Sequence, residues 1–231
     1  MEKDCLSRLR SGFVDGIILA GTGRNSRLVR DIQASGISML QIVRCQDARI
    51  SSIVADYRVC GADAAKYLRA RGCRKLGLIN GSFQYAPYKE RYEGFTQAVE
   101  ALGLEAHFCE SDRPINSFEY GYDCANQLLD ETPDLDAILA AVDVQGLGAI
   151  RAVTQRGLRI PDQIKIISLT GHEIGAMLQT TMTSMEMPAQ RMGDKAAQMI
   201  IEEIESGAGP DQRSSPQHLS FTMQLEERES T

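Results

Sequence analysis

VDGIILAGTGRNSRLVRDIQAS, residues 14–35, contains a predicted strand, a turn and a helix in succession. Apolar and β-branched residues fill 14–20, glycines interrupt 21–23, and Leu28 and Ile32 share one face of the helix predicted over 25–35. The next apolar run, 37–43, predicts a second strand. A strand, a crossing helix and another strand form the unit from which parallel sheets are built.

The same alternation continues along the chain. Apolar runs predict strands at 52–55, 75–80, 105–109, 136–141, 164–169 and 218–225, and amphipathic stretches predict helices at 59–71, 86–102, 117–129, 143–156 and 188–206. This rhythm predicts an α/β fold class with parallel sheets that are covered by helices on both faces. Ligands bind such sheets at the carboxyl ends of the strands.

The composition is that of an ordinary globular protein. Hydrophobic residues make up 43% and charged residues 24% of 231, and no apolar run reaches the roughly 20 residues of a membrane-spanning helix. Residues 1–5 carry no signal segment, so we expect a cytoplasmic protein without membrane contact. Its six cysteines form no C-x-x-C pair, and we expect reduced thiols packed as small apolar side chains.

The charge is unevenly distributed along the chain. The formal net charge is −6, but residues 1–80 hold 14 Lys and Arg against 7 Asp and Glu, whereas residues 81–231 hold 11 against 24. Two interpretations stay open. The basic part faces an acidic partner, or the charges are solvated helix faces.

Catalytic patterns are absent from the sequence. There is no P-loop, and Gly21-x-Gly23 lacks the third glycine of a dinucleotide fingerprint. The three histidines, His107, His172 and His218, are too scattered to predict a catalytic triad or a metal site. We therefore predict that the chain is not an enzyme and holds neither a cofactor nor a metal.

One stretch combines residue types that suit ligand binding. Residues 80–95 place a strand end, an aromatic loop and Arg91 in the first turns of a helix. An arginine can donate two parallel hydrogen bonds to hydroxyl groups or to a carboxylate of a ligand, and Tyr85 or Tyr88 can stack on a ligand ring. The competing interpretation is an arginine paired with a neighbouring acid.

The chain resembles, over nearly its whole length, the effector-binding domain of the lactose-repressor family of bacterial transcription regulators. This family shares the fold of type I periplasmic binding proteins. The resemblance is carried, in the order of the family, by residues 14–19, 54–56, 61–68, 72–76, 91–95, 136–138, 143, 147–149, 157–161, 183–185 and 192–193.

The resemblance implies two Rossmann-like lobes, each with a parallel sheet, and an effector in the cleft. By position, the N-terminal lobe comprises 1–72 and 188–215, and the C-terminal lobe 73–187 and 216–231. The first lobe normally begins with further strands and a DNA-binding headpiece precedes it, so we expect both to be missing from this chain and operator DNA to be bound only through that headpiece.

The resemblance also nominates effector-binding residues. Arg91 matches the arginine that grips the effector, and Asp143 begins a helix that faces the cleft. Val142, Thr170 and Met187 stand where sugar-binding members carry polar side chains, which favours a less polar or aromatic effector than a simple sugar. The predicted effector site comprises Asp56, Tyr85, Arg91, Val142, Asp143, Thr170 and Met187.

Family members dimerise through two segments, which here contain Leu147, Ile174, Met177 and Leu178. Apolar residues there suit a homodimer interface, although core packing explains them equally well. The resemblance implies a ligand-sensing and dimerisation domain of a transcription regulator, a repressor. A solute-binding component of a transport system with the same fold, or an enzyme on an α/β scaffold, are the alternatives.

Overall fold

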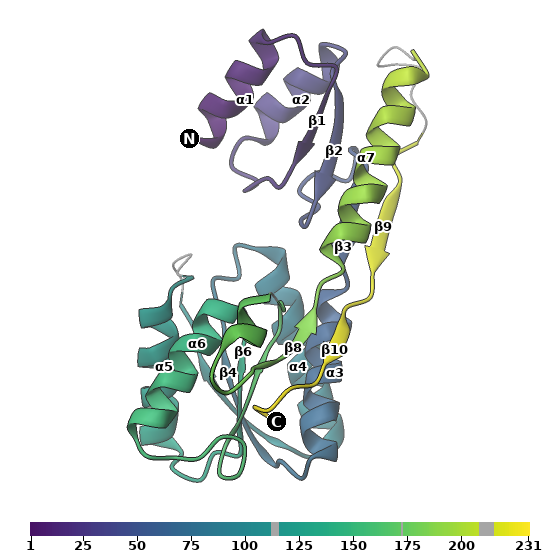
Figure 1. Ribbon diagram of the computed structural model, residues 1–231. Coiled ribbons are helices and arrows are strands. Elements are labelled where there is room, and N and C mark those ends of the chain that lie inside the picture. Colours follow the sequence, from purple (N-terminus) through teal and green to yellow (C-terminus); the bar gives the residue numbers. More distant parts are fainter. Residues whose placement is uncertain (112–115, 172, 208–214) are drawn as a thin grey trace. The chain divides into compact units, whose positions relative to one another are not determined.

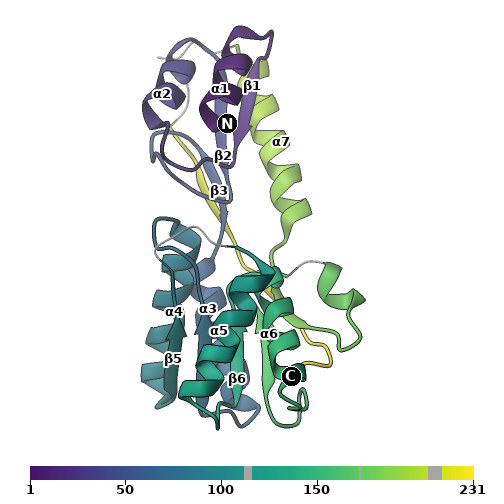
Figure 2. The same cartoon turned by 90° about the vertical axis from the view of Figure 1, so that its left-hand side faces the viewer.

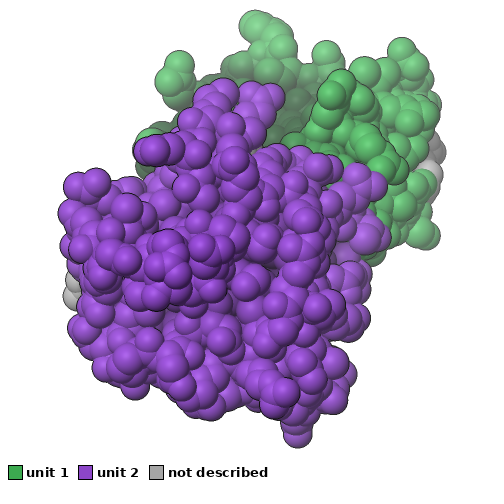
Figure 3. Space-filling model, turned by 60° about the horizontal axis from the view of Figure 1, so that its bottom comes forward, with its two compact units in different colours: residues 1–55, 188–221 green, residues 56–187, 222–231 purple. Residues whose placement is uncertain are grey.

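The computed structural model describes residues 1–111, 116–171, 173–207 and 215–231. The chain divides into two compact units, which Figure 3 shows in different colours. Unit 1 comprises Met1–Ala55 and Pro188–Phe221, and unit 2 comprises Asp56–Met187 and Thr222–Thr231.

Unit 1 is a parallel sheet between helices (Figure 1). Its elements are α1 (Glu2–Ser11), β1 (Gly16–Leu19), α2 (Ser26–Ala34), β2 (Ser38–Ile42), β3 (Ser52–Ala55), α7 (Ala189–Glu205) and β9 (His218–Phe221). The strand order is β1-β2-β3-β9, with every neighbouring pair parallel. Leu6 of α1 and Ile32 of α2 pack with Ile17 of β1 in one apolar cluster, while α7 lies along the sheet's other face.

Unit 2 contains the larger sheet. Its elements are α3 (Tyr57–Ala70), β4 (Lys75–Ile79), α4 (Ala86–Leu102), β5 (Glu105–Cys109), α5 (Phe118–Glu131), β6 (Ala137–Ala140), α6 (Asp143–Gln155), β7 (Lys165–Ser168), the short 3-10 helix η1 (Glu173–Met177), β8 (Thr183–Glu186) and β10 (Gln224–Glu226). The order is β10-β8-β7-β6-β4-β5, and only β10 runs antiparallel to its neighbour.

The strand order of unit 2 creates a point where successive connections diverge. The chain passes from β4 outward to β5, then returns across β4 to β6 and on to β7. Right-handed connections therefore place α4 on one face and α5 and α6 on the other, as Figures 1 and 2 show. The predicted α/β fold class with two parallel-sheet units is confirmed.

The boundaries between the units differ from the expected ones. Residues 56–72 were assigned to the N-terminal lobe, but α3 lies in unit 2 because it packs along α4. The single strand expected at 218–225 is two strands: β9 pairs with β3 of unit 1, and β10 pairs with β8 of unit 2. Residues 216–221 therefore belong to unit 1, not to the other unit.

The expectation of six reduced thiols was wrong for two of them. Cys109 at the end of β5 and Cys124 on α5 form a disulfide, with their Cα atoms 5.6 Å apart. The close packing of α5 on β5 brings the two side chains together, which no sequence spacing reveals. Cys60 and Cys73 are buried free thiols, as expected, whereas Cys5 and Cys45 are exposed.

Candidate functional site

The candidate site lies at the carboxyl edge of the unit 2 sheet. The strands β4 and β6 are neighbours there, and the chain leaves them in opposite directions. Open α/β sheets bind ligands outside the carboxyl ends of the strands at such a point of divergence. The segments that follow β4, β6 and β7 begin at Asn80, Ala141 and Leu169.

Arg91 is the centre of a buried polar group at this edge. Its Nη2 donates to Oγ1 of Thr170 at 3.4 Å, and that hydroxyl donates in turn to the carbonyl of Ala141 at 2.8 Å. The guanidinium carbon lies 4.6 Å from the centroid of the Tyr57 ring, which is cation–π geometry. We call Arg91, Thr170, Ala141 and Tyr57 the Arg91 cluster; it joins α3, α4 and the ends of β6 and β7.

Close packing of α3 on α4 fixes the position of Arg91. A Cβ on Gly61 would lie 2.2 Å from the carbonyl oxygen of Arg91, and a Cβ on Gly94 would lie 1.9 Å from that of Arg58. Only glycine permits this backbone approach. The two glycines therefore allow the helices to pack closely enough for Arg91 to reach Thr170, and Arg91 itself is only 3% exposed.

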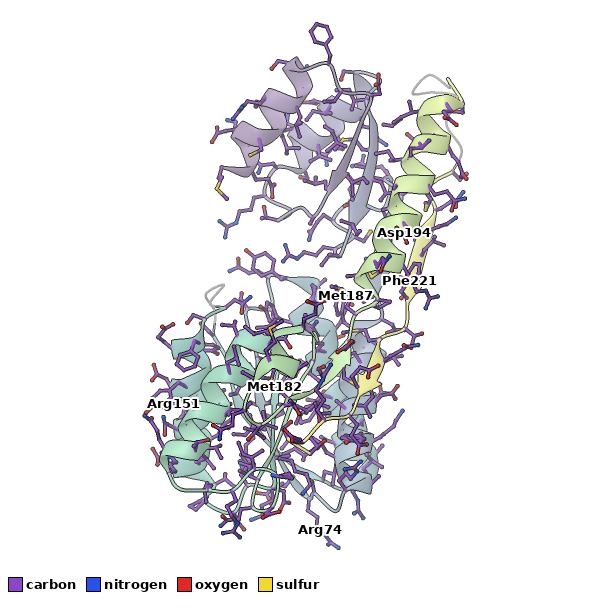
Figure 4. All side chains as sticks on the ribbon, viewed as in Figure 1. Arg74, Arg151, Met182, Met187, Asp194 and Phe221 are labelled. Carbon is purple, nitrogen blue, oxygen red and sulfur yellow. A yellow bond between two sulfur atoms is a disulfide. The ribbon has the colours of Figure 1, made fainter. Side chains whose placement is uncertain are left out.

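Three further contacts lie around the cluster. The Tyr57 hydroxyl donates to Sδ of Met187 at 3.8 Å, and the backbone N–H of Met187 donates to the carbonyl of Thr170 at 3.1 Å. Met187, labelled in Figure 4, lies two residues before the start of α7. Beneath them, Cys60 donates to the carbonyl of Leu169 at 3.6 Å. Burial raises the pKa of the Cys60 thiol to about 11, so this group remains protonated at neutral pH.

A second polar layer follows β4. The Asn80 side chain is buried and donates from Nδ2 to the carbonyl of Tyr88 at 3.2 Å, whereas its Oδ1 has no hydrogen-bond partner among the described residues. The Tyr120 hydroxyl donates to the carbonyl of Asn80 at 2.9 Å, and burial raises the pKa of Tyr120 to about 12. A small hollow beside this layer is lined by Gly81, Phe83, Glu110 and Ser111.

Three of the seven predicted effector residues lie together. Arg91, Thr170 and Met187 meet through the contacts described above, although they are separated by up to 96 positions in the chain. Helix packing and strand order produce this meeting, because all three positions follow the carboxyl ends of strands or face them. Their binding roles stay predictions.

The other four predicted residues occupy helix starts. Val142 directly precedes α6, and Asp143 is the first residue of α6 and 8% exposed; it follows two residues after Ala141, whose carbonyl receives the Thr170 hydrogen bond. Tyr85 precedes α4 and is half-buried. The carboxylate of Asp56 caps α3 by accepting from the backbone N–H of Val59 at 2.9 Å, so local structure accounts for this residue.

Sequence reasoning missed two members of the site. Tyr57 stacks on Arg91, and the buried side-chain Oδ1 of Asn80 has no hydrogen-bond partner among the described residues. Asn80 stood at a predicted strand end, which was a usable signal. No periodicity or motif pointed to Tyr57, because its contact with Arg91 arises from the packing of two helices.

The four predicted dimerisation residues lie on α6 and around η1. Ile174 is 40% exposed and Met177 is 75% exposed, whereas Leu147 and Leu178 are half-buried. Leu178 also packs against the core of unit 2. Core packing therefore accounts for Leu178, whereas a contact of Ile174 and Met177 with a second copy of the chain stays a prediction.

The histidines that the structure describes have structural partners. His107 hydrogen-bonds with Glu105 at 2.9 Å, and His218 hydrogen-bonds with Ser52 at 2.9 Å. His172 lies outside the described residues. Within the described ranges, no three His, Cys, Asp or Glu side chains gather closely enough to hold a metal ion. Over the same ranges, no helix combines the length and the apolar character needed to cross a bilayer.

Comparison with known proteins identifies the family. The profile of the periplasmic binding protein-like domain matches residues 65–231. The ribose operon repressor of Halalkalibacterium halodurans is 28% identical over 204 residues, which cover 88% of this chain and 60% of that protein. The HTH-type transcriptional repressor PurR of Pasteurella multocida is 31% identical over 208 residues, which cover 87% of this chain and 61% of that protein.

This chain thus spans about 60% of the length of these curated relatives. Among solved structures, a LacI family transcriptional regulator from Enterococcus faecium with bound ribose shares the fold with a TM-score of 0.87 at 18% identity, covering 99% of this chain and 83% of that one. The chain therefore belongs to the family of periplasmic binding protein-like domains.

Proposed function

We propose that this chain is the ligand-sensing domain of a bacterial transcription regulator, a repressor, and that a small-molecule effector binds at the carboxyl edge of unit 2 around Arg91. The observation that carries the proposal is Arg91 itself. A buried guanidinium at the point where strand connections diverge has a hydroxyl and an aromatic ring as partners, and its Nε has no partner among the described residues. Buried donors are normally satisfied, so an unmet one at a strand end favours a ligand.

The residues around Arg91 suggest how an effector is held. Arg91 donates to it, Asp143 accepts hydrogen bonds from it, and Tyr85 offers an aromatic face. Val142 and Met187 supply apolar contacts. One relative named above is a ribose operon repressor and one structural neighbour contains ribose, which supports an effector of monosaccharide size.

The proposed regulation follows from differential binding. An effector that binds one conformation of the regulator more tightly than another shifts the population toward the first, and equal affinity for both shifts nothing. Operator DNA and a second copy of the chain are the proposed partners, with Ile174 and Met177 in the contact between copies. The named relatives are transcription regulators, which favours this function over transport or catalysis and implies a cytoplasmic location.

The proposal is tested by titrating the purified chain with a panel of monosaccharides and sugar acids in a calorimeter. Arg91→Gln removes a charged donor worth about 1.5–3 kcal/mol, so the dissociation constant should rise by roughly 10- to 100-fold. Arg156→Gln is the matched control, because Arg156 pairs with Asp130 on the remote ends of α6 and α5. Unchanged affinity in Arg91→Gln, or no binding by any compound, contradicts the proposal.

A further inference from the structure

We propose that the Cys109–Cys124 disulfide is a reversible redox switch: oxidised, it fastens the carboxyl end of strand β5 to α5, and reduced, it releases that strand end. From the proposed function the inference takes only the cytoplasmic location. Three features of the described residues carry it: the place of β5 at the edge of the sheet, the surface position of the Cys109 sulfur, and a hydrogen-bond acceptor beside that sulfur.

The first feature is the unequal support of the two elements that the disulfide joins. Among the described strands, β5 stands last in the order of its sheet and pairs with β4 alone. In contrast, α5 is held on two sides. A Cβ on Gly121 would overlap the backbone carbonyl of Gln145 on α6, and Leu128 is fully buried in the core of unit 2. Loss of the link therefore releases the strand end and leaves the helix in place.

The end of β5 contacts the segment that follows β4. The carbonyl of Cys109 accepts from the backbone N–H of Asn80 at 2.9 Å and lies 3.4 Å from the hydroxyl of Tyr120. The hollow beside this strand end is lined by Gly81, Phe83, Glu110 and Ser111. Release of the strand end therefore changes the hollow as well as the strand itself.

The second feature is the accessibility of one of the two sulfurs. Cys109 is 7% exposed and Cys124 is 2% exposed. The side chain of Gln127, which lies beside the Cys109 sulfur, belongs to an exposed residue. Thiol–disulfide exchange requires an attacking thiolate to reach one sulfur of the bond. Sγ of Cys109 is therefore the atom that a small thiol attacks.

The third feature is an acceptor that only the reduced form uses. Oε1 of Gln127 lies 3.6 Å from Sγ of Cys109, while Nε2 of the same amide donates to Oε1 of Glu131 at 2.9 Å. A disulfide sulfur carries no proton and donates nothing, whereas a thiol donates a weak hydrogen bond. The folded chain thus already provides a partner for the reduced Cys109, which suits a reversible switch better than a permanent crosslink.

The reductant and the oxidant are a small thiol and its disulfide, for which glutathione is the probe. In the cytoplasm glutathione keeps most thiols reduced, and disulfides there are usually transient. A glutathione thiolate attacks Sγ of Cys109, forms a mixed disulfide and displaces Cys124 as a thiolate. A second glutathione thiolate attacks the glutathione sulfur of the mixed disulfide, so glutathione disulfide leaves and Cys109 is freed. Two electrons and the two thiol protons pass to the protein, and the reverse sequence restores the link.

A redox titration of the native chain is the first part of the test. The chain is equilibrated in glutathione buffers that span the poise of a bacterial cytosol, and its thiols are alkylated and located by peptide mass spectrometry. We expect Cys109 and Cys124 to change together from oxidised to reduced within this span, and to change back when oxidised glutathione is restored. The buried thiols of Cys60 and Cys73 should resist alkylation throughout, which establishes that the chain stays folded.

Backbone NMR relaxation of the folded chain measures the release. On reduction, the amide order parameters of residues 109–111 should fall from about 0.85 to below about 0.6, while those of β6 in the middle of the sheet stay unchanged. The double variant Cys109→Ser with Cys124→Ser should show the low values in every buffer. If this variant does not fold, the reduced wild type supplies the same measurement.

A variant of Gln127 distinguishes a switch from a crosslink that is merely reducible. Gln127→Ala removes the acceptor of the Cys109 thiol and destabilises only the reduced form. The ratio of squared reduced to oxidised glutathione at half-reduction should therefore rise about threefold. Asn126→Ala is the matched control on the same helix, because the Asn126 side chain accepts from Arg156 instead and the ratio should not change.

Three results would overturn the proposal. The first is a disulfide that remains oxidised in all of these buffers while the chain is folded. The second is reduction that leaves the order parameters of residues 109–111 unchanged. The third is a half-reduction ratio that is the same in Gln127→Ala and in wild type. None of these measurements uses an effector, so they stand or fall separately from the proposed sensing function.

Discussion

Replacing Gly61 with alanine should loosen the packing of α3 on α4 and displace Arg91. The new Cβ would lie 2.2 Å from the carbonyl oxygen of Arg91 and 3.1 Å from the backbone nitrogen of Phe95. Both neighbours are backbone atoms of α4, so neither can rotate away. An ordinary carbon–oxygen contact needs about 3.4 Å, and the helices must therefore separate by roughly 1 Å.

The expected cost follows from that displacement. Overpacking a close-packed contact costs about 1–3 kcal/mol, and a clash with rigid backbone belongs at the upper end, about 3 kcal/mol. For a chain of this length each kcal/mol lowers Tm by about 2–4 °C, so Gly61→Ala should melt roughly 6–12 °C below wild type. Because functional side chains need placement within about 0.5 Å, the variant should also bind the effector at Arg91 more weakly.

Thermal unfolding followed by far-UV circular dichroism measures the effect. The control is Gly193→Ala on α7, where no described atom outside the helix's own backbone lies within 4 Å of the added Cβ, and helix propensity alone favours alanine by about 1 kcal/mol. That variant should melt at or slightly above the wild-type temperature. A Gly61→Ala protein that melts within about 2 °C of wild type would refute the argument that close backbone contact positions Arg91.

Three further predictions concern charge, covalent linkage and assembly. Hydrogen bonds from Arg49 hold the pKa of Asp47 far below its usual range. This carboxylate therefore stabilises the fold above the unfolded pKa of about 4, and the contribution is lost as pH falls. In urea unfolding, the stability of Asp47→Asn should depend less on pH below about 4 than the stability of wild type does. Replacing Cys109 and Cys124 with serine removes a disulfide that spans 15 positions and should lower the unfolding free energy by about 3 kcal/mol. A reductant should lower the unfolding free energy of wild type to the same value and leave that of the variant unchanged. Met177→Glu should halve the mass measured by light scattering with an unchanged circular dichroism spectrum; a mass equal to that of wild type would contradict a contact through η1.

The periodicity of the sequence was enough to locate most elements. The helix predicted at 86–102 and the strands predicted at 52–55 and 105–109 have those bounds in the structure. Each is a short apolar run or an amphipathic stretch with a clear end, so local side-chain pattern determines it. The helix predicted from residue 59 begins at Tyr57 instead, because Asp56 caps it two residues earlier.

The end of the chain shows where local pattern fails. An apolar run over 218–225 predicted one strand, but its two halves pair with different sheets, β9 with β3 and β10 with β8. A strand's partner is set by hydrogen bonds to distant residues, and the run of side chains is the same whichever sheet receives it. The packing partner of a helix is likewise set by residues far away in the chain, so α3 was expected in the N-terminal lobe but lies against α4 in unit 2.

The candidate site divides in the same way. Strand ends and the resemblance of 91–95 nominated Arg91, Thr170 and Met187 before their contacts were visible. The Tyr57 ring beside Arg91, and the lack of a partner for the Arg91 Nε among the described residues, became apparent only from the packed structure.

By itself, the sequence determined the fold class and the order of strands and helices, because periodicity and turns act over short stretches; for ligand binding it supplied predicted residues only. Only the tertiary structure decided the unit boundaries, the Cys109–Cys124 link and the contacts of Arg91 with Thr170 and Tyr57. These depend on how closely Gly61 and Gly94 allow two helices to pack and on which strands become neighbours, and both are properties of contacts between residues far apart in the chain.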